Sequence, residues 1–238
     1  MAGRGWRARV ARAGRLLRVG AAASCCLWSL PLPALSVEGE AVAVGPGARG
    51  PAAETRYQFR VDQCASRIRS EWHSVSGELL AWDEVEFDAG RWRSYRLVRP
   101  GLGQDFRQQA PPAPPGRAAA EPFLAGPMLV DYARRELAAL RAGASREVRY
   151  LIAESGSDIR LRLRAVRRDG GGTSVVVDAA QVWLRPVVPR AQIEFDASGR
   201  FAAMQGQILP QHGSARHPEP VQAAVSVRSS AATSRCHN

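Results

Sequence analysis

The pattern of apolar and polar positions predicts a chain rich in β-strands. Apolar residues alternate with polar ones at strand spacing over 57–62, 79–88, 148–152 and 159–166; further strands are expected over 92–98, 173–184 and 193–195, and a closing strand begins at Phe201. The clearest run is 159–166, where Ile159, Leu161 and Leu163 alternate with three arginines. Turn signals separate neighbouring runs at hairpin spacing, which is typical of an antiparallel sheet.

Two of these turns predict a specific register. A three-residue loop over 169–171 pairs 159–168 with 172–182, so that Arg162 lies opposite Asp178 and Leu163 lies beside Val177 on the buried face. The same residues would pair differently with any other loop length, because a shift of one position moves every side chain to the other face.

The second turn, over 196–200, closes the hairpin within 190–207. A type I turn followed by a left-handed residue suits this sequence, with Gly199 taking the positive φ. That register pairs Asp196 with Arg200, Phe195 with Phe201, and Ile193 with Ala203.

One segment has helical rather than strand spacing. Met128, Leu129, Tyr132, Leu137 and Leu140 lie at helical spacing near 127–141, after Pro127 and before Gly143. Together with the strands, this predicts an α+β fold: a curved antiparallel sheet of about eight strands folded over one helix.

Large apolar residues delimit the predicted domain. Residues 37–54 and 210–238 contain no aromatic, Leu, Ile or Met, so we expect both to be disordered, because they cannot bury enough surface to offset the entropy of ordering. The folded part is then a single domain over 55–209.

The first 36 residues are typical of an export signal. Six arginines precede an uncharged stretch that ends in Ala34-Leu35-Ser36, with small residues at the −3 and −1 positions of a cleavage site. We therefore expect export to the periplasm and a mature chain that begins at Val37. The alternatives are an uncleaved leader that anchors the chain, lipidation at Cys25, and a mitochondrial transit peptide.

The charge balance depends on this leader. All 33 basic residues are Arg, and losing the six in the leader lowers the formal net charge from +11 to +5. The stripe formed by Arg160, Arg162 and Arg164 has no aromatic residue interleaved on its face and no accompanying nucleic-acid motif. We expect a solvated sheet face here and no nucleic-acid partner.

Two cysteines, Cys64 and Cys236, lie outside the leader. An even number in an oxidising compartment favours one disulfide, which would close a loop of more than 170 residues. The alternative is a buried thiol at Cys64 and an unrelated thiol in the tail. Two cysteines are too few for a zinc site, and no cofactor or metal is expected.

Catalytic side chains are sparse in the predicted domain. His73 is its one histidine, and the acidic run that contains Asp83, Glu84 and Glu86 could supply carboxylates to a hydrolase. No nucleophile motif accompanies them, and strand alternation puts Asp83 on the face opposite Glu84 and Glu86. A polar strand end at His73 and a solvated acidic row are the alternatives.

The run 173–184 is apolar on both faces. Helix and sheet could cover both faces as ordinary core. Alternatively, Val175, Val177 and Trp183 could line a groove between sheet and helix for an apolar or lipid-like ligand.

Three stretches carry a resemblance to a group of proteins. Residues 122–129 (PFLAGPML), 193–200 (IEFDASGR) and 205–210 (QGQILP) are similar to segments of exported, β-rich bacterial envelope proteins of unknown function. The resemblance implies a bacterial envelope protein and assigns no activity.

These observations together favour a non-enzymatic exported envelope protein, either a scaffold or a weak binder of an apolar or lipid-like ligand. Its expected partners are that ligand or another envelope protein, and the export machinery through its leader. The alternative is an exported hydrolase that uses His73 with Asp83, Glu84 and Glu86.

Overall fold

A single antiparallel sheet dominates the computed structural model, which describes residues 34–44, 55–88, 91–111, 122–168, 171–232 and 236. Within these residues, 64% lie in strands and the strands form one 13-stranded sheet. The strands are β1 Leu35–Ala43, β2 Arg56–Gln63, β3 Arg67–Ser74, β4 Leu79–Asp88, β5 Arg91–Arg99, β6 Gln104–Gln109, β7 Phe123–Leu124, β8 Ser145–Ile152, β9 Ser157–Arg167, β10 Thr173–Ala179, β11 Ala191–Phe195, β12 Phe201–Ser214 and β13 His217–Ala232.

The strand order follows the chain, with one exception. From one edge to the other the order is β6-β5-β4-β3-β2-β1-β13-β12-β11-β10-β9-β8-β7, so that β1 and β13 pair with each other in the middle. β7 and β8 are parallel, and the other neighbouring pairs among the described strands are antiparallel. The first and last described strands therefore join the two halves of the sheet.

The sheet curls until its two edge regions meet. The amide of Gln108 in β6 donates a hydrogen bond to the Ala153 carbonyl at 3.4 Å, and Arg99 at the end of β5 forms an ion pair with Glu154 at 2.7 Å. Ala153 and Glu154 both belong to the turn between β8 and β9.

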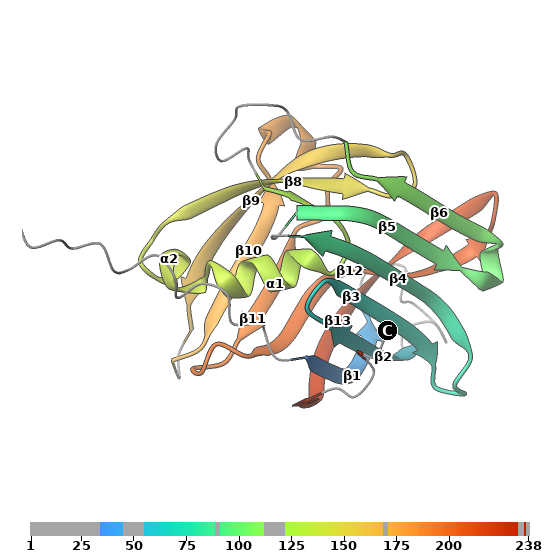
Figure 1. The fold of residues 1–238 in the computed structure, drawn as a ribbon, viewed down its shortest axis with the longest axis horizontal. Coiled ribbons are helices and arrows are strands. Elements are labelled where there is room, and N and C mark those ends of the chain that lie inside the picture. Colours follow the sequence, from blue (N-terminus) through green and yellow to red (C-terminus); the bar gives the residue numbers. More distant parts are fainter. Residues whose placement is uncertain are drawn as a thin grey trace, which may run out of the picture. The chain divides into compact units, whose positions relative to one another are not determined.

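Two short helices, α1 Met128–Arg135 and α2 Leu137–Arg141, fill the concave side of the sheet (Figure 1). Tyr132, Leu137 and Leu140 are buried in the same core as Val175 and Phe195 on the strands. A helical face at these positions therefore packs on the sheet, and the chain turns at Glu136 between the two helices.

The predicted fold class is wrong. The protein is mostly β, with 13 strands among the described residues and two short helices, not an α+β domain with about eight strands. The sequence pattern underestimated the strand content at both ends of the chain.

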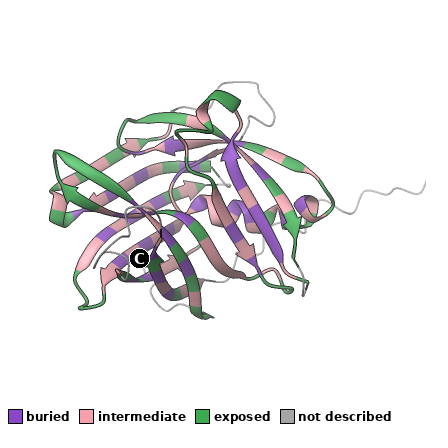
Figure 2. Cartoon of the chain, turned by 180° about the vertical axis from the view of Figure 1, so that it is seen from behind, coloured by how far each residue is buried: buried purple, intermediate pink, exposed green. Residues whose placement is uncertain are grey.

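The expectation of disordered terminal segments is likewise wrong for their described parts. β1 lies within the segment expected to be leader and linker, while β12 extends past residue 210 and β13 spans His217–Ala232. These strands can be buried because their side chains are small. Ala41 and Ala223 are fully buried, and Gly39 packs so closely on Phe59 that a Cβ at Gly39 would lie 2.5 Å from the Phe59 ring. Figure 2 shows buried and more exposed residues alternating along many of the strands. The predicted cleavage position after Ser36 falls inside β1.

The first predicted hairpin has the expected register. Arg162 pairs with Asp178 and Leu163 pairs with Val177. Arg168 N–H donates to the Gly172 carbonyl at 3.1 Å, which closes the three-residue loop. β10 nevertheless ends at Ala179, so the predicted strand over 173–184 is too long.

The second hairpin follows the prediction at its turn and departs from it beyond. Phe195 pairs with Phe201, and Gly199 has φ +81° as expected. Ile193, however, pairs with Met204 and not with Ala203, because a β-bulge after Glu194 shifts the register.

Candidate functional site

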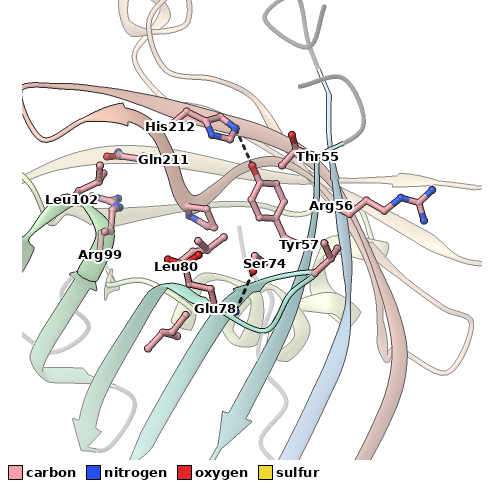
Figure 3. A pocket seen from close by; sticks show the side chains of 14 residues that line it. Thr55, Arg56, Tyr57, Ser74, Glu78, Leu80, Arg99, Leu102, Gln211 and His212 are labelled. Carbon is pink, nitrogen blue, oxygen red and sulfur yellow. Dashed lines mark hydrogen bonds between the residues drawn. The ribbon is translucent and has the colours of Figure 1, made fainter. Parts of the chain in front are cut away.

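A pocket of about 520 Å³ opens at one end of the sheet (Figure 3). Four segments line it: the start of β2, the turn between β3 and β4, the end of β5 with the 3-10 turn η2 Pro100–Leu102, and the middle of β12. Its volume lies within the range of about 300–1,000 Å³ that is typical of small-molecule sites. The lining residues are Thr55, Arg56, Tyr57, Ser74, Val75, Glu78, Leu79, Leu80, Arg99, Gly101, Leu102, Pro210, Gln211 and His212.

The β3–β4 turn brings apolar side chains to the pocket. Gly77 takes φ +86° and its N–H donates to the Ser74 carbonyl at 3.0 Å, while Glu78 N–H donates to the Ser74 hydroxyl at 3.1 Å. Val75 in this turn and Leu79 at the start of β4 both line the pocket. Together with Leu80, Leu102 and Pro210, these side chains make the wall largely apolar.

A buried tyrosine supplies one polar contact of the pocket. The Tyr57 hydroxyl lies 2.9 Å from His212 Nε2, and the two rings tilt toward each other with centroids 6.3 Å apart. Burial raises the pKa of Tyr57, so the hydroxyl stays protonated at neutral pH. The contact joins β2 to β12 across the sheet.

Arg99 forms a second polar contact and is 3% exposed. Its guanidinium donates to the Leu209 carbonyl at 2.8 Å, to Gln104 Oε1 at 3.0 Å and to the Glu154 carboxylate at 2.7 Å. Because a carboxylate already balances its charge, Arg99 holds the pocket wall together and offers no free cation to a ligand.

Gln211 leaves one polar atom without a partner. Its side-chain Oε1 is buried and accepts no hydrogen bond from the described residues. An unpaired buried acceptor costs about 1–3 kcal/mol. In the view of Figure 3, Gln211, Arg99 and Leu102 lie on one side of the pocket, with Tyr57 and His212 nearer the other. The pocket thus has a largely apolar wall, and the unpaired Oε1 of one lining residue, Gln211, is buried beside it.

The four residues of the hydrolase hypothesis do not come together. His73 Nδ1 lies 3.3 Å from the Gly77 carbonyl, and its other nitrogen lies 3.8 Å from the Glu71 carboxylate. Glu84 lies beside two arginines of β3 on the outer face, and Glu86 accepts a hydrogen bond from the Ser94 hydroxyl at 2.7 Å.

Asp83 points into the protein and is 1% exposed. The Tyr95 hydroxyl donates to its carboxylate at 2.9 Å, and the Ser70 hydroxyl donates to the other oxygen. Burial raises the pKa of Asp83 to about 6, although these two hydrogen bonds and the nearby Arg99 oppose the shift. Gly126 closes over the cluster, since a Cβ there would lie 2.4 Å from Asp83 Oδ2. The carboxyl group therefore ties β4 to β3 and β5 through its hydrogen bonds and packs against Gly126, just before α1.

Val175, Val177 and Trp183, which were predicted to line a ligand groove, do not lie together. Val175 and Val177 are 0% and 3% exposed, because the helices cover them as ordinary core. Trp183 lies beyond the end of β10 in the 3-10 turn η3 Val182–Leu184 and is 74% exposed. Side chains fill the space between sheet and helices at these valines.

Cys64 and Cys236 form a disulfide, and their Cα atoms are 5.5 Å apart. The bond joins the end of β2 to the chain just after β13. It therefore fastens the C-terminal part of the chain to the neighbouring region of the sheet.

Sequence reasoning missed the pocket residues. Tyr57 was placed on a strand without a partner, and His212 and Gln211 were placed in the disordered tail. No local motif links them, because the four segments that line the pocket are far apart in the chain.

Among the described residues, no group of three or more His, Cys, Asp or Glu side chains could hold a metal ion. No helix in the same residues has both the length and the apolar character needed to cross a bilayer.

Comparisons with known proteins give similarity to solved structures alone. No model of a protein family matches the chain, and no curated protein matches it by sequence. A crystal structure of a beta-barrel-like protein of the domain of unknown function DUF1849 from Brucella abortus aligns with 86% of this chain and 100% of its own, at 9% identity and a TM-score of 0.41. A similarity at this level transfers neither a fold nor a function.

Proposed function

We propose that this chain is a non-enzymatic, exported protein of the bacterial envelope that binds a small amphipathic molecule in the pocket at the end of the sheet. The pocket itself carries the proposal, because it has a volume of about 520 Å³ and a wall that is apolar over most of its area. The interior between sheet and helices is not proposed as the site, since core side chains occupy it.

The polar groups narrow the class of ligand. Gln211 lines the pocket, and a turn of its side chain toward a bound ligand would give the buried, unpaired Oε1 a donor, whereas Arg99 is already paired with Glu154. A charged head group would gain no free counter-charge from Arg99, and the other two charged lining residues, Arg56 and Glu78, have opposite signs. We therefore expect an uncharged head with a hydroxyl or amide N–H, joined to an apolar body that packs on Leu80 and Leu102.

Two features support the proposed location. The arginine-rich leader is typical of an export signal, and a disulfide such as Cys64–Cys236 persists in oxidising compartments like the periplasm. Lipidation at Cys25 and an uncleaved leader remain the alternatives that N-terminal analysis distinguishes.

A fluorescent probe tests the pocket directly. N-phenyl-1-naphthylamine is uncharged and apolar and carries one N–H donor, so it should bind and brighten. Leu102→Trp places a larger side chain on the wall and should weaken binding at least about tenfold. Val166→Trp is the matched control, because Val166 is 53% exposed and lies near the opposite end of the sheet; its affinity should stay within about twofold.

A second variant separates a binding role from a structural one. Gln211→Leu removes the unpaired acceptor, so the free protein should be at least as stable as the wild type while probe affinity falls about fivefold. Equal probe affinity in the wild type and Leu102→Trp, or probe binding lost only when Gln211→Leu also unfolds the protein, would contradict the proposal.

A further inference from the structure

The segment between β10 and β11 presents apolar side chains to solvent. Val182, Trp183 and Val187 are 69%, 74% and 71% exposed. Tryptophan is usually well covered in folded proteins, and contiguous exposed apolar side chains commonly form an interaction surface. We call residues 180–190 the Trp183 segment.

Hydrogen bonds hold the Trp183 segment in a defined conformation. Leu184 N–H donates to the Gln181 carbonyl at 3.1 Å, and Val188 N–H donates to the Leu184 carbonyl at 2.9 Å. The Arg185 side chain donates to the Ala179 carbonyl at 3.4 Å, which ties the segment to the end of β10. The apolar side chains are therefore presented by an ordered turn, which lowers the entropy lost on binding.

The Trp183 segment itself carries charge of one sign, although Asp178 and Glu194 flank it in the sequence. Residues 179–193 contain Arg185 and Arg190 and no Asp or Glu. Both arginines are exposed. A surface with an exposed tryptophan, aliphatic side chains and arginines is complementary to the head groups and upper acyl chains of an anionic bilayer.

The Trp183 segment lies at the end of the sheet where the pocket opens. The antiparallel register joins the end of β10 to the start of β9, and the turn before β9 contacts Arg99 through Glu154. Arg99 lines the pocket. A surface bound at the Trp183 segment would thus face the same end of the sheet as the pocket.

We propose that the Trp183 segment docks this protein on the surface of an anionic lipid bilayer. Trp183 inserts at the level of the head groups, Val182 and Val187 bury against the acyl boundary, and the two arginines meet lipid phosphates. This inference concerns the surface of the protein and holds whether or not the pocket is occupied.

Vesicle co-sedimentation tests the docking. Vesicles of phosphatidylcholine containing 30% phosphatidylglycerol, chosen as a simple anionic surface, should bind the protein; pure phosphatidylcholine should bind it at least about fivefold more weakly. Trp183→Ala should lower binding to the anionic vesicles, and Trp183→Phe should keep most of it. Arg185→Glu should lower binding by about fivefold or more, since each basic residue near such a surface contributes roughly that factor.

Matched controls use the opposite end of the sheet. Val166→Ser removes an exposed apolar side chain there, and Arg91→Glu makes the same charge change as Arg185→Glu. Both should bind as the wild type does. Equal binding to both kinds of vesicle, no binding to either, or undiminished binding of Trp183→Ala would overturn the proposal. So would self-association that Trp183→Ala abolishes, which would make the segment a protein interface instead.

Discussion

Replacing Asp83 with asparagine should remove a pH dependence from the stability of the protein. The Asp83 carboxyl group is buried, and its hydrogen-bond donors are the hydroxyls of Tyr95 and Ser70. Asparagine has the same shape and can still accept from Ser70, while its amide can donate to the Tyr95 oxygen. The substitution therefore removes the ionisable group with little change in packing.

The size of this change in stability follows from the pKa shift of Asp83. The pKa of Asp83 rises from 3.8 to about 6 because burial disfavours the charged form. The folded protein then binds the proton more tightly than the unfolded chain, so wild-type stability falls as the pH rises from about 4 to about 6. Above that window the full cost of about 3 kcal/mol is present, and below it the cost is absent.

Urea unfolding of the oxidised protein, followed by tryptophan fluorescence between pH 4 and 7.5, measures this effect. The difference in unfolding free energy between Asp83→Asn and the wild type should change by about 3 kcal/mol in favour of the variant as the pH rises. Glu86→Gln, on the exposed face of the same strand, is the control, and its difference should vary by less than about 1 kcal/mol. A constant difference for Asp83→Asn, or a change of the opposite sign, would refute the reasoning.

Three further predictions concern the chain ends and a turn. Reduction of the Cys64–Cys236 bond should lower the unfolding free energy by up to about 5 kcal/mol, and a Cys64→Ser, Cys236→Ser variant should not respond to reductant. Gly199→Val should cost about 1–2 kcal/mol in urea unfolding, because Gly199 has φ +81°; a fully stable variant would contradict the left-handed assignment. N-terminal sequencing of the exported protein should begin at Val37, and a start at a lipidated cysteine or at the initiator methionine would exclude that cleavage.

Strand alternation was predictable where side chains of contrasting size follow one another. Leu161 and Leu163 alternate with arginines, and the structure places both leucines in the core. The turn over 196–200 was predictable because glycine is the residue that takes its left-handed position. In these places local chemistry decides the structure.

The predictions failed where tertiary packing decides. β13 buries Val221, Ala223 and Val225 against neighbouring strands, although its composition alone suggested disorder. Conversely, Val182 and Trp183 continue an apolar run and yet lie in an exposed turn. Apolar character shows that a residue can be buried, not that the fold has a partner for it.

The candidate site depended on contacts between distant segments. Asp83 was correctly placed on the face opposite Glu84, but its burial depends on Tyr95 and Gly126, which come from other elements. Likewise, Tyr57 and His212 are 155 positions apart and meet only when β2 and β12 take their places in the sheet. No local sequence pattern predicts such a long-range contact.

Native mass spectrometry of the protein isolated from its own envelope tests the pocket most directly. The account predicts that a small molecule is bound to the wild type and to Val166→Trp, and that Leu102→Trp has lost it. The bound molecule should have an uncharged head group with a hydroxyl or an amide N–H. A wild-type protein with no bound molecule, or a bound molecule that Leu102→Trp retains, would contradict it.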